Sequence, residues 1–543
     1  MSQGSETGDP SGGSGGPKVK APVNHWIVAL TVTLATFMEV LDTSIANVAL
    51  PYIAGGLSVG RSQSTWVLTS YLVANAIVLP LSGWFIGLVG RKKYYMSCVA
   101  LFTIASAACG AAPSIEFLIL FRLIQGFAGG GLQPSEQGIL VDTFPKAQLG
   151  MAMAIYGVAV VVAPVLGPTL GGYITDNYSW RWIFYINIPV GILSLILTHF
   201  IVVDPPEMAE VVKKGRKNFY KLDYVGLSLI SIGLGSMEVC FAKGQEWDWY
   251  NDPFWRAQVF MVGAVVGLIA FVAWEMNHPN PIINIRLLGE RNFLMCGIII
   301  YLSFSVLYGA NNVLPQMVQS LFGYDALRAG LIMSPAALFT MAVMPVVGFL
   351  LGKKVDGRFL VPVGLVSVVV SSLWMTGFTM DASPYALNLP RCLMMFGVGF
   401  LFVPLNNAAY IYLPKDQINN ATGLFNMLRN EGGSFGIAVV TVMVDRRSQH
   451  HVSRLAEHVV PTNHALQPQL DYYTDQRMLR GGVSRPVAED QAMGLLNQMI
   501  NNQAEFWSYL DIYAIFAVIG ALALPLIFLM KKSVKQEGSL EVG

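Results

Sequence analysis

The sequence predicts an all-α polytopic membrane protein, with about fourteen transmembrane helices in two six-helix bundles and two extra central helices. Three observations lead to this fold class. Of the 543 residues, 54% are hydrophobic and only 12% are charged, whereas soluble domains carry roughly 25% charged residues. Apolar runs long enough to cross a bilayer recur along the chain, and its two halves resemble each other.

The apolar runs define the expected membrane spans. A helix needs about 20 mostly apolar residues to cross the hydrocarbon, and only a helix pairs its own backbone groups there. The candidate spans lie at residues 25–48, 64–86, 95–114, 116–139, 150–174, 182–203, 223–242, 256–275, 292–318, 327–351, 359–379, 389–412, 421–444 and 506–530.

An internal repeat divides these spans into two halves. The stretch from Arg122 to Pro134 resembles the stretch from Arg391 to Pro404, offset by one position. Parallel repeats of this kind are typical of transporters. We expect residues 1–24 as a disordered tail, 25–203 as the N-terminal bundle, 204–222 as a linker, 223–275 as the two extra helices, 276–445 as the first five helices of the C-terminal bundle, 446–505 as a long outer loop, 506–530 as the last span and 531–543 as a tail.

Basic residues in the short loops predict the orientation. Cytoplasmic loops carry an excess of Lys and Arg, and one arrangement places every basic cluster inside. In it both termini are cytoplasmic, and the loop 446–505 faces the periplasm. The clusters are Arg91-Lys92-Lys93, Lys213-Lys214, Lys353-Lys354 and Lys531-Lys532.

Several other classes of function find little support. A net charge of +1 does not favour nucleic acid as a partner, and the five cysteines lie singly, without metal-ligand spacing. The run GFLLGKK (348–354) ends in Val355 and follows no strand, so it is not a phosphate-binding loop. No cofactor is expected. The loop 446–505 contains four histidines, which are read as solvated side chains or as a metal site: His450, His451, His458 and His464.

Two carboxylates lie inside the first span. Glu39 and Asp42 are three residues apart and therefore neighbours on a helix. A charge at mid-membrane costs about 2.5–3.5 kcal/mol on insertion scales, so such residues face a cavity or a partner. Arg122, alone in an apolar span, is the expected cation. The three residues are candidates for proton coupling, and the alternative places Asp42 at the outer interface with a structural role.

Further polar residues within the spans are candidates for lining a substrate cavity. The alternative for Glu136 is a solvated charge at a helix end, and Arg429 is expected to pair with Glu431. The cavity candidates are Gln133, Glu136, Gln137, Asn311, Asn312, Gln316, Asn406, Asn407 and Asn430.

Several motifs resemble a known family. LDTSIANVALP (41–51), GLVGRKK (87–93), RLIQG (122–126) and APVLGPTLGG (163–172) are similar to stretches of the major facilitator superfamily, and the first and last to its fourteen-helix drug:proton antiporter branch. WVLTSYLVANAIVLPLSGW (66–84) and DNYSWRWIFYINIPVG (176–191) resemble the EmrB type of multidrug resistance protein. The resemblance implies the major facilitator fold.

Two of these motifs also have a physical interpretation. The glycines of GPTLGG allow close helix approach, and the prolines in and before it bend the span. The motif is therefore expected to pack helices or to set the direction of antiport. Its residues are Pro164, Gly167, Pro168, Gly171 and Gly172. The basic loop contains Gly90, Arg91 and Lys92. Where the family carries an Asp this chain has Gly87, so the loop is read as an inside anchor, with a gating contact as the alternative.

The resemblance implies a proton-driven exporter of hydrophobic or amphipathic drugs in a bacterial inner membrane, embedded in lipid. It also implies a periplasmic membrane-fusion adaptor (EmrA-like) and an outer-membrane channel as partners, with the segment 486–507 as a docking surface. An exporter of one metabolite, lipid or siderophore is the alternative. A passive facilitator is a third hypothesis, and an enzyme is disfavoured because no catalytic constellation is present.

Overall fold

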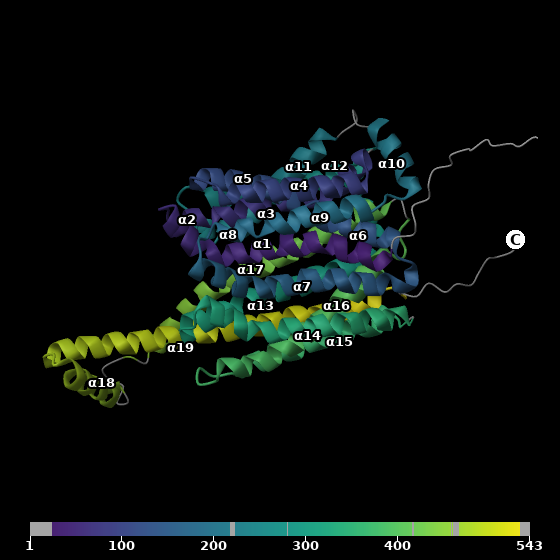
Figure 1. Cartoon of the computed structure of the whole chain (residues 1–543). Coiled ribbons are helices and arrows are strands. Elements are labelled where there is room, and N and C mark those ends of the chain that lie inside the picture. The colour runs from purple at the N-terminus through teal and green to yellow at the C-terminus, as the bar shows by residue number, and fades with distance from the viewer. Residues whose placement is uncertain are drawn as a thin grey trace, which may run out of the picture.

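Long helices lying side by side make up nearly all of the described chain (Figure 1). The predicted N-terminal tail falls, apart from Asn24, outside the described part. The computed structural model describes residues 24–532 except 218–222, 280, 354, 415–416, 458 and 460–465.

The first lobe is built from the N-terminal helices, purple to blue in Figure 1. Two of its spans are interrupted: α5 stops at the glycines before α6, and the short α8 leads into α9. The helices are α1 (His25–Gly56), α2 (Arg61–Ser64), α3 (Trp66–Val89), α4 (Arg91–Gly110), α5 (Ile115–Gly129), α6 (Leu132–Thr143), α7 (Lys146–Asn177), α8 (Trp182–Tyr185) and α9 (Asn187–Ile201).

The second lobe follows the same plan in the C-terminal half. Its last helix lies against α13, α15 and α17, although a long segment separates it from them in sequence. The helices are α13 (Arg291–Phe322), α14 (Ala326–Gly352), α15 (Gly357–Met375), α16 (Asn388–Tyr410), α17 (Ile418–Ala456) and α19 (Arg485–Ala523).

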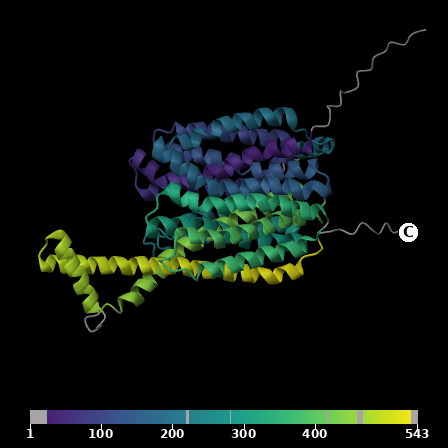
Figure 2. The ribbon, with the colours of Figure 1, turned by 60° about the horizontal axis from the view of Figure 1, so that its bottom comes forward.

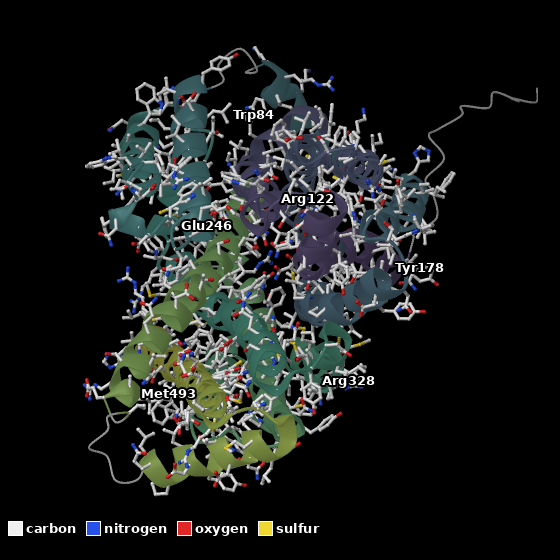
Figure 3. The ribbon with its side chains drawn as sticks, turned by 90° about the vertical axis from the view of Figure 1, so that its left-hand side faces the viewer. Trp84, Arg122, Tyr178, Glu246, Arg328 and Met493 are labelled. Carbon is white, nitrogen blue, oxygen red and sulfur yellow. The ribbon has the colours of Figure 1, made fainter. Side chains whose placement is uncertain are left out.

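Two extra spans lie between the lobes in sequence and beside both in space (Figure 3). They are α11 (Tyr224–Lys243) and α12 (Arg256–Asn277), which follow the surface helix α10 (Pro206–Lys217). The first of the pair, α11, packs on α3 of the first lobe and on α17 of the second. It is therefore the extra helix that contacts both lobes.

Length and hydropathy identify twelve of the described helical segments as able to cross a membrane. Two further long helices, α4 and α17, pack among them: α4 against α5, and α17 against α13. Both are more polar, because α4 begins with Arg91-Lys92-Lys93 and α17 carries Arg429 and Glu431. The protein is an all-α, multi-pass membrane protein.

The segment predicted as a long outer loop is largely helical. Both α17 and α19 are 39 residues long and extend beyond the rest of the bundle (Figure 2). The helix α18 (Leu466–Gly481) packs back on α19. Residues 486–507 are helical and run into the last span, since α19 begins at Arg485 and is continuous to Ala523. We call the described part of residues 446–505 the helical projection.

The two lobes touch most closely where glycines allow it. Gly348 of α14 lies against the backbone of Met151 on α7, so that a Cβ added at this glycine would be only 2.9 Å from the Met151 Cα. At the other end of the same helix pair, Gly330 lies against Thr169. Small residues of this kind drive helix association in lipid, where packing replaces the hydrophobic effect.

The motif GPTLGG joins α7 to α1. Because Pro168 has no N–H, the carbonyl of Pro164, four residues earlier, loses its helical hydrogen bond. The Ser44 hydroxyl of α1 donates to that carbonyl at 2.8 Å. Gly167 sits beside the same serine, and a Cβ there would lie 2.4 Å from the Ser44 Cβ. The predicted close approach of helices at this motif is therefore present, with α1 as the partner helix.

We expect Gly167→Ala to destabilise the first lobe by about 1–3 kcal/mol, the usual cost of overpacking, because the added methyl group would displace Ser44. The apparent melting temperature of the purified protein in detergent would fall. Gly87→Ala is the matched control, since its added methyl group meets open space on α3. Equal melting of the two variants would contradict the packing role of Gly167.

Candidate functional site

Asp42 and Arg122 form an ion pair inside the first lobe. The Arg122 Nη1 donates to the Asp42 Oδ2 at 2.5 Å, and both side chains are almost completely buried. Arg122 also donates through its Nε to the Val67 carbonyl at 3.1 Å. Figure 3 places Arg122 among the helices of this lobe rather than between the two lobes. Of the two carboxylates, the predicted cation Arg122 therefore pairs with Asp42.

Neighbouring polar groups complete the coordination of this pair. Asn187 of α9 donates to the Asp42 Oδ1 at 2.6 Å, and Gln125 donates to the same oxygen at 3.1 Å. The Arg122 guanidinium lies 4.4 Å from the centroid of the Tyr71 ring. A buried charge of either sign is tolerated when it is paired and hydrogen-bonded in this way. Asp42 is thus a fully coordinated anion, and it holds α1, α5 and α9 together.

Glu39 lies one turn before Asp42 on α1 and has its own set of partners, on α3 and α6. Its Oε1 accepts hydrogen bonds from the Tyr71 hydroxyl at 2.9 Å and from the Asn75 side chain at 3.3 Å. Its Oε2 accepts one from the Gln133 amide at 2.6 Å. Within the described residues Glu39 makes no ion pair. Its direct partners are all neutral donors, so protonation of Glu39 breaks no ion pair.

Arg429 brings the second lobe to this carboxylate. It lies on α17 and donates to the Gln133 Oε1 and, at 2.7 Å, to the Tyr156 hydroxyl of α7. Gln133 therefore bridges Glu39 of one lobe and Arg429 of the other. A cation that is one side chain away stabilises the carboxylate less than a direct contact does, because the interaction falls with distance.

A second set of hydrogen bonds crosses between the lobes beside this one. Gln137 of α6 donates to the Asn406 Oδ1 at 3.0 Å, and its Oε1 accepts from Asn426 at 2.8 Å and from the Tyr410 hydroxyl at 3.0 Å. All four side chains are buried. In this conformation the lobes are closed over their central polar groups. We call the hydrogen bonds made by Glu39, Gln133, Gln137 and Arg429 the inter-lobe network.

Glu136 is buried rather than solvated. It has no exposed surface, and Thr33 of α1 donates to its Oε1 at 2.6 Å. The alternative of a solvated charge at a helix end is therefore wrong, because α6 continues beyond Glu136 to Thr143 and packs on α1.

The remaining cavity candidates lie apart from one another. Asn430 is half-buried and donates to Asn75 at 3.5 Å. Asn407 is half-buried on α16. Gln316 donates to Asn312 at 2.9 Å and lines a surface hollow of about 540 Å³ within the second lobe. The structure therefore gathers Gln133, Glu136, Gln137, Asn406 and Asn430 at the lobe contact, and it places Asn312 and Gln316 elsewhere.

The internal repeat gives Arg122 a counterpart in the second lobe. Arg391 of α16 is buried and donates to the Asn311 side chain of α13. Asn311 thus occupies the position that Asp42 occupies in the first lobe, so one repeat carries the carboxylate and the other a neutral amide.

The predicted pairing of Arg429 with Glu431 is wrong. Residues two apart on a helix point to opposite sides, and Arg429 faces the inter-lobe network. Glu431 instead contacts Glu238 of the extra helix α11.

The residues of the basic loop contact two acidic residues elsewhere in the chain. Gly90 has φ +91°, a backbone conformation that favours glycine. Arg91 is buried, forms an ion pair with Asp142 and donates to the Gly138 carbonyl at 2.6 Å. The Lys92 backbone N–H donates to Asp204 at 2.9 Å. Asp142 and Asp204 thus supply carboxylates to a loop whose own motif carries Gly87 instead of an acid.

One described histidine of the helical projection, His451, has a carboxylate partner. The His451 Nε2 lies 2.8 Å from the Asp511 Oδ2, which also accepts from the Arg447 Nε at 2.7 Å. These contacts join α17 to α19. His458 and His464 lie outside the described residues. In the described part of the chain no group of three or more His, Cys, Asp or Glu side chains could hold a metal ion.

Sequence reasoning missed several partners of the two carboxylates. Asn75, Gln125 and Asn187 each interrupt an apolar run, and an isolated amide in a span was the signal that could have identified them. Glu238 was missed as well, although a single acid within a span marks a functional candidate by default.

Two lobes of membrane-spanning helices, with buried charges at their contact and no catalytic constellation in the described chain, define a membrane transporter. The chain belongs to the Major Facilitator Superfamily, whose family model matches residues 32–437, and the resemblance to its EmrB type is confirmed by relatives of that name.

Three relatives are similar along most of the chain. Fatty acid resistance protein FarB of Neisseria gonorrhoeae is 35% identical, over 95% of this chain and 97% of that protein. Multidrug export protein EmrB of Escherichia coli K12 is 35% identical, over 93% of this chain and 95% of that protein. EmrB of Haemophilus influenzae is 38% identical, over 80% of this chain and 84% of that protein.

Solved structures share the fold at low sequence identity. The proton:xylose symporter XylE has a TM-score of 0.55 and 13% identity, covering 91% of this chain and 94% of that one. The human organic anion transporter MFSD10 has a TM-score of 0.54 and 13% identity, covering 91% of this chain and 99% of that one.

We expect Asp42→Asn to destabilise the protein by about 3–5 kcal/mol, because it leaves the buried Arg122 without its counter-ion. Thermal unfolding in detergent would measure the loss. The double variant Asp42→Asn with Arg122→Gln removes both charges and is expected to recover part of the stability. A double variant less stable than Asp42→Asn would contradict this account.

Proposed function

We propose that the protein is a proton-coupled multidrug efflux antiporter that works by alternating access. The observation that carries the proposal is Glu39, a buried carboxylate held by three neutral donors and linked through Gln133 to Arg429 of the opposite lobe. Names of similar proteins support drugs as the cargo, because two of them are multidrug export proteins.

The inter-lobe network couples protonation to the position of the lobes. An ionised Glu39 accepts the Gln133 amide, which keeps the Gln133 carbonyl oriented towards Arg429. A protonated Glu39 no longer accepts at both oxygens, so the link to Arg429 weakens and the lobes can separate there. A ligand shifts such an equilibrium only by its differential affinity for the two forms. A drug and a proton that compete for the same carboxylate therefore drive opposite halves of the cycle.

The other predicted members of the coupling site, Asp42 and Arg122, have a supporting role in this proposal. Their ion pair fixes α1 within the first lobe, and α1 carries Glu39. Asp42 is paired directly with Arg122, whereas Glu39 makes no ion pair within the described residues. We therefore propose Glu39, and not Asp42, as the carboxylate that exchanges the proton.

The proton gradient supplies enough energy for export. A proton gains about 2.3 kcal/mol per 100 mV and about 1.4 kcal/mol per pH unit. One proton per cycle thus sustains on the order of a hundredfold accumulation of drug. No cofactor is part of the proposal.

We place the protein in a bacterial inner membrane with both termini in the cytoplasm, the side to which its basic loops belong. The helical projection then faces the periplasm. Its exposed α18 and the first half of α19 are the surface we propose for docking a membrane-fusion adaptor, which would connect the pump to an outer-membrane channel. This partnership follows the EmrB-type resemblance.

We expect Glu39→Gln to reduce proton-driven export to background. The amide mimics the protonated acid permanently, so drug binding should become independent of pH, whereas in the wild type it should weaken as the pH falls. Uptake of fluorescent drugs into inverted vesicles under an imposed pH gradient measures export, and equilibrium binding to the purified protein measures affinity.

Glu116→Gln is the control for this experiment, because Glu116 is exposed and its partner is the nearby Ser114 side chain. It should export like the wild type. Wild-type export by Glu39→Gln over a range of pH would remove Glu39 from the proton path. Export that survives collapse of the gradient would make the protein a facilitator.

The FarB similarity favours a second candidate cargo. That relative is named for fatty acid resistance and aligns along almost its whole length, so a dedicated exporter of one lipid or metabolite class is the alternative function.

We expect chemically unrelated cationic and neutral dyes to compete with one another for export, since a multidrug site accepts many shapes. The inverted-vesicle assay measures the competition, with a long-chain fatty acid as an additional competitor. If only the fatty acid competes, the alternative replaces the multidrug proposal.

A further inference from the structure

Two glutamates meet where the extra helix α11 packs on the second lobe. Glu238 lies on α11 and Glu431 on α17, and their side chains contact each other. Both are almost completely buried, with 3% and 4% of their surfaces exposed. Next to them Phe241 packs on Phe435, with ring centroids 6.0 Å apart. The acids therefore face each other in a closed contact between helices rather than in water.

No basic side chain of the described residues forms an ion pair with either glutamate. Ser434 contacts Glu238, and Tyr301 of α13 is the titratable neighbour on the other side. Tyr71, on the adjoining α3, faces Glu39 instead. The Oε2 of Glu431 accepts no hydrogen bond from any described group. The acids thus have fewer donors than Glu39, and they lack the cation that neutralises Asp42.

Two carboxylates in contact cannot both keep their charge in this setting. Their repulsion is unscreened in the low-dielectric interior, and each charge would also lose its hydration. A proton between the two groups removes one charge and converts the contact into a hydrogen bond, which supplies the partner that the Glu431 Oε2 lacks. Carboxyl pairs that share a site behave in this way.

The geometry points to a second proton-binding site, in which Glu238 and Glu431 share one proton during transport. This site is separate from Glu39 and connects α11 to α17. The inference rests on the proposed function to the extent that the proton is taken up and released during export; the shared proton itself does not depend on it.

The position of Glu431 on α17 links the Glu238–Glu431 contact to the movement of the lobes. It is two residues from Arg429 on α17, so the two side chains leave opposite sides of one helix. Arg429 belongs to the inter-lobe network, while Glu431 contacts the extra helix. A tilt of α17 that breaks the Arg429 contacts would also separate Glu431 from Glu238, and a separated, hydrated pair releases its proton.

Infrared spectroscopy of the purified protein at neutral pH tests the shared proton directly, because it distinguishes a protonated carboxyl group from a carboxylate. We expect the double variant Glu238→Gln with Glu431→Gln to lose the intensity of one protonated carboxyl group relative to the wild type. Glu238→Leu with Glu431→Leu gives the same readout if the first variant does not fold. Glu116→Gln should leave the protonated bands unchanged.

If the double variant keeps the full intensity of the protonated bands, or loses the intensity of two carboxyl groups, the proposal of a shared proton is wrong. The pH profile of export in inverted vesicles then tests its use: the double variant should show a flatter profile than the wild type, with drug binding retained. An unchanged profile would overturn the transport role. If export instead needs no proton gradient at all, the proposed function fails while the infrared result still decides whether the proton is shared.

Discussion

Burial of charge away from water constrains this molecule more than any other interaction. Each ionised side chain within the helices must find a partner, because the membrane interior offers no solvent to replace one. The chain meets this requirement in three different ways. Asp42 is neutralised by Arg122, Glu39 is held by neutral donors, and Glu238 faces another acid. The separate roles that we propose rest on these differences: the first carboxylate stabilises a lobe, and the other two bind protons.

The three carboxylates also lie at three different kinds of helix contact. Asp42 lies within one lobe, so moving the lobes leaves its partners in place. Glu39 lies where the lobes meet, and Glu238 lies where an extra helix meets a lobe. In the proposed transport cycle only the last two would change their surroundings, and α17 contributes to both through Arg429 and Glu431. The proposed coupling therefore depends on α17 and its neighbours as much as on α1.

The fold was predictable because hydropathy alone fixes where helices cross a bilayer, and the spans, the repeat and the GPTLGG contact are readable from local pattern. The partners of Arg429 were not predictable in this way. Whether it meets Glu431, its near neighbour in sequence, or Gln133, almost 300 residues away, depends on how two lobes pack. The helices in the rest of the outer segment were not predictable for a similar reason, since its polar sequence is stabilised as helix where α17 and α18 pack on α19.

The continuity of α17 and α19 has a mechanical consequence. Each helix passes without a break from the membrane-embedded lobe into the helical projection, and 39 residues of α-helix measure about 58 Å. A rigid rod that is fixed at one end turns a small rotation into a large sweep at its tip. The projection would therefore act as a lever arm, whose tip moves furthest when the second lobe tilts.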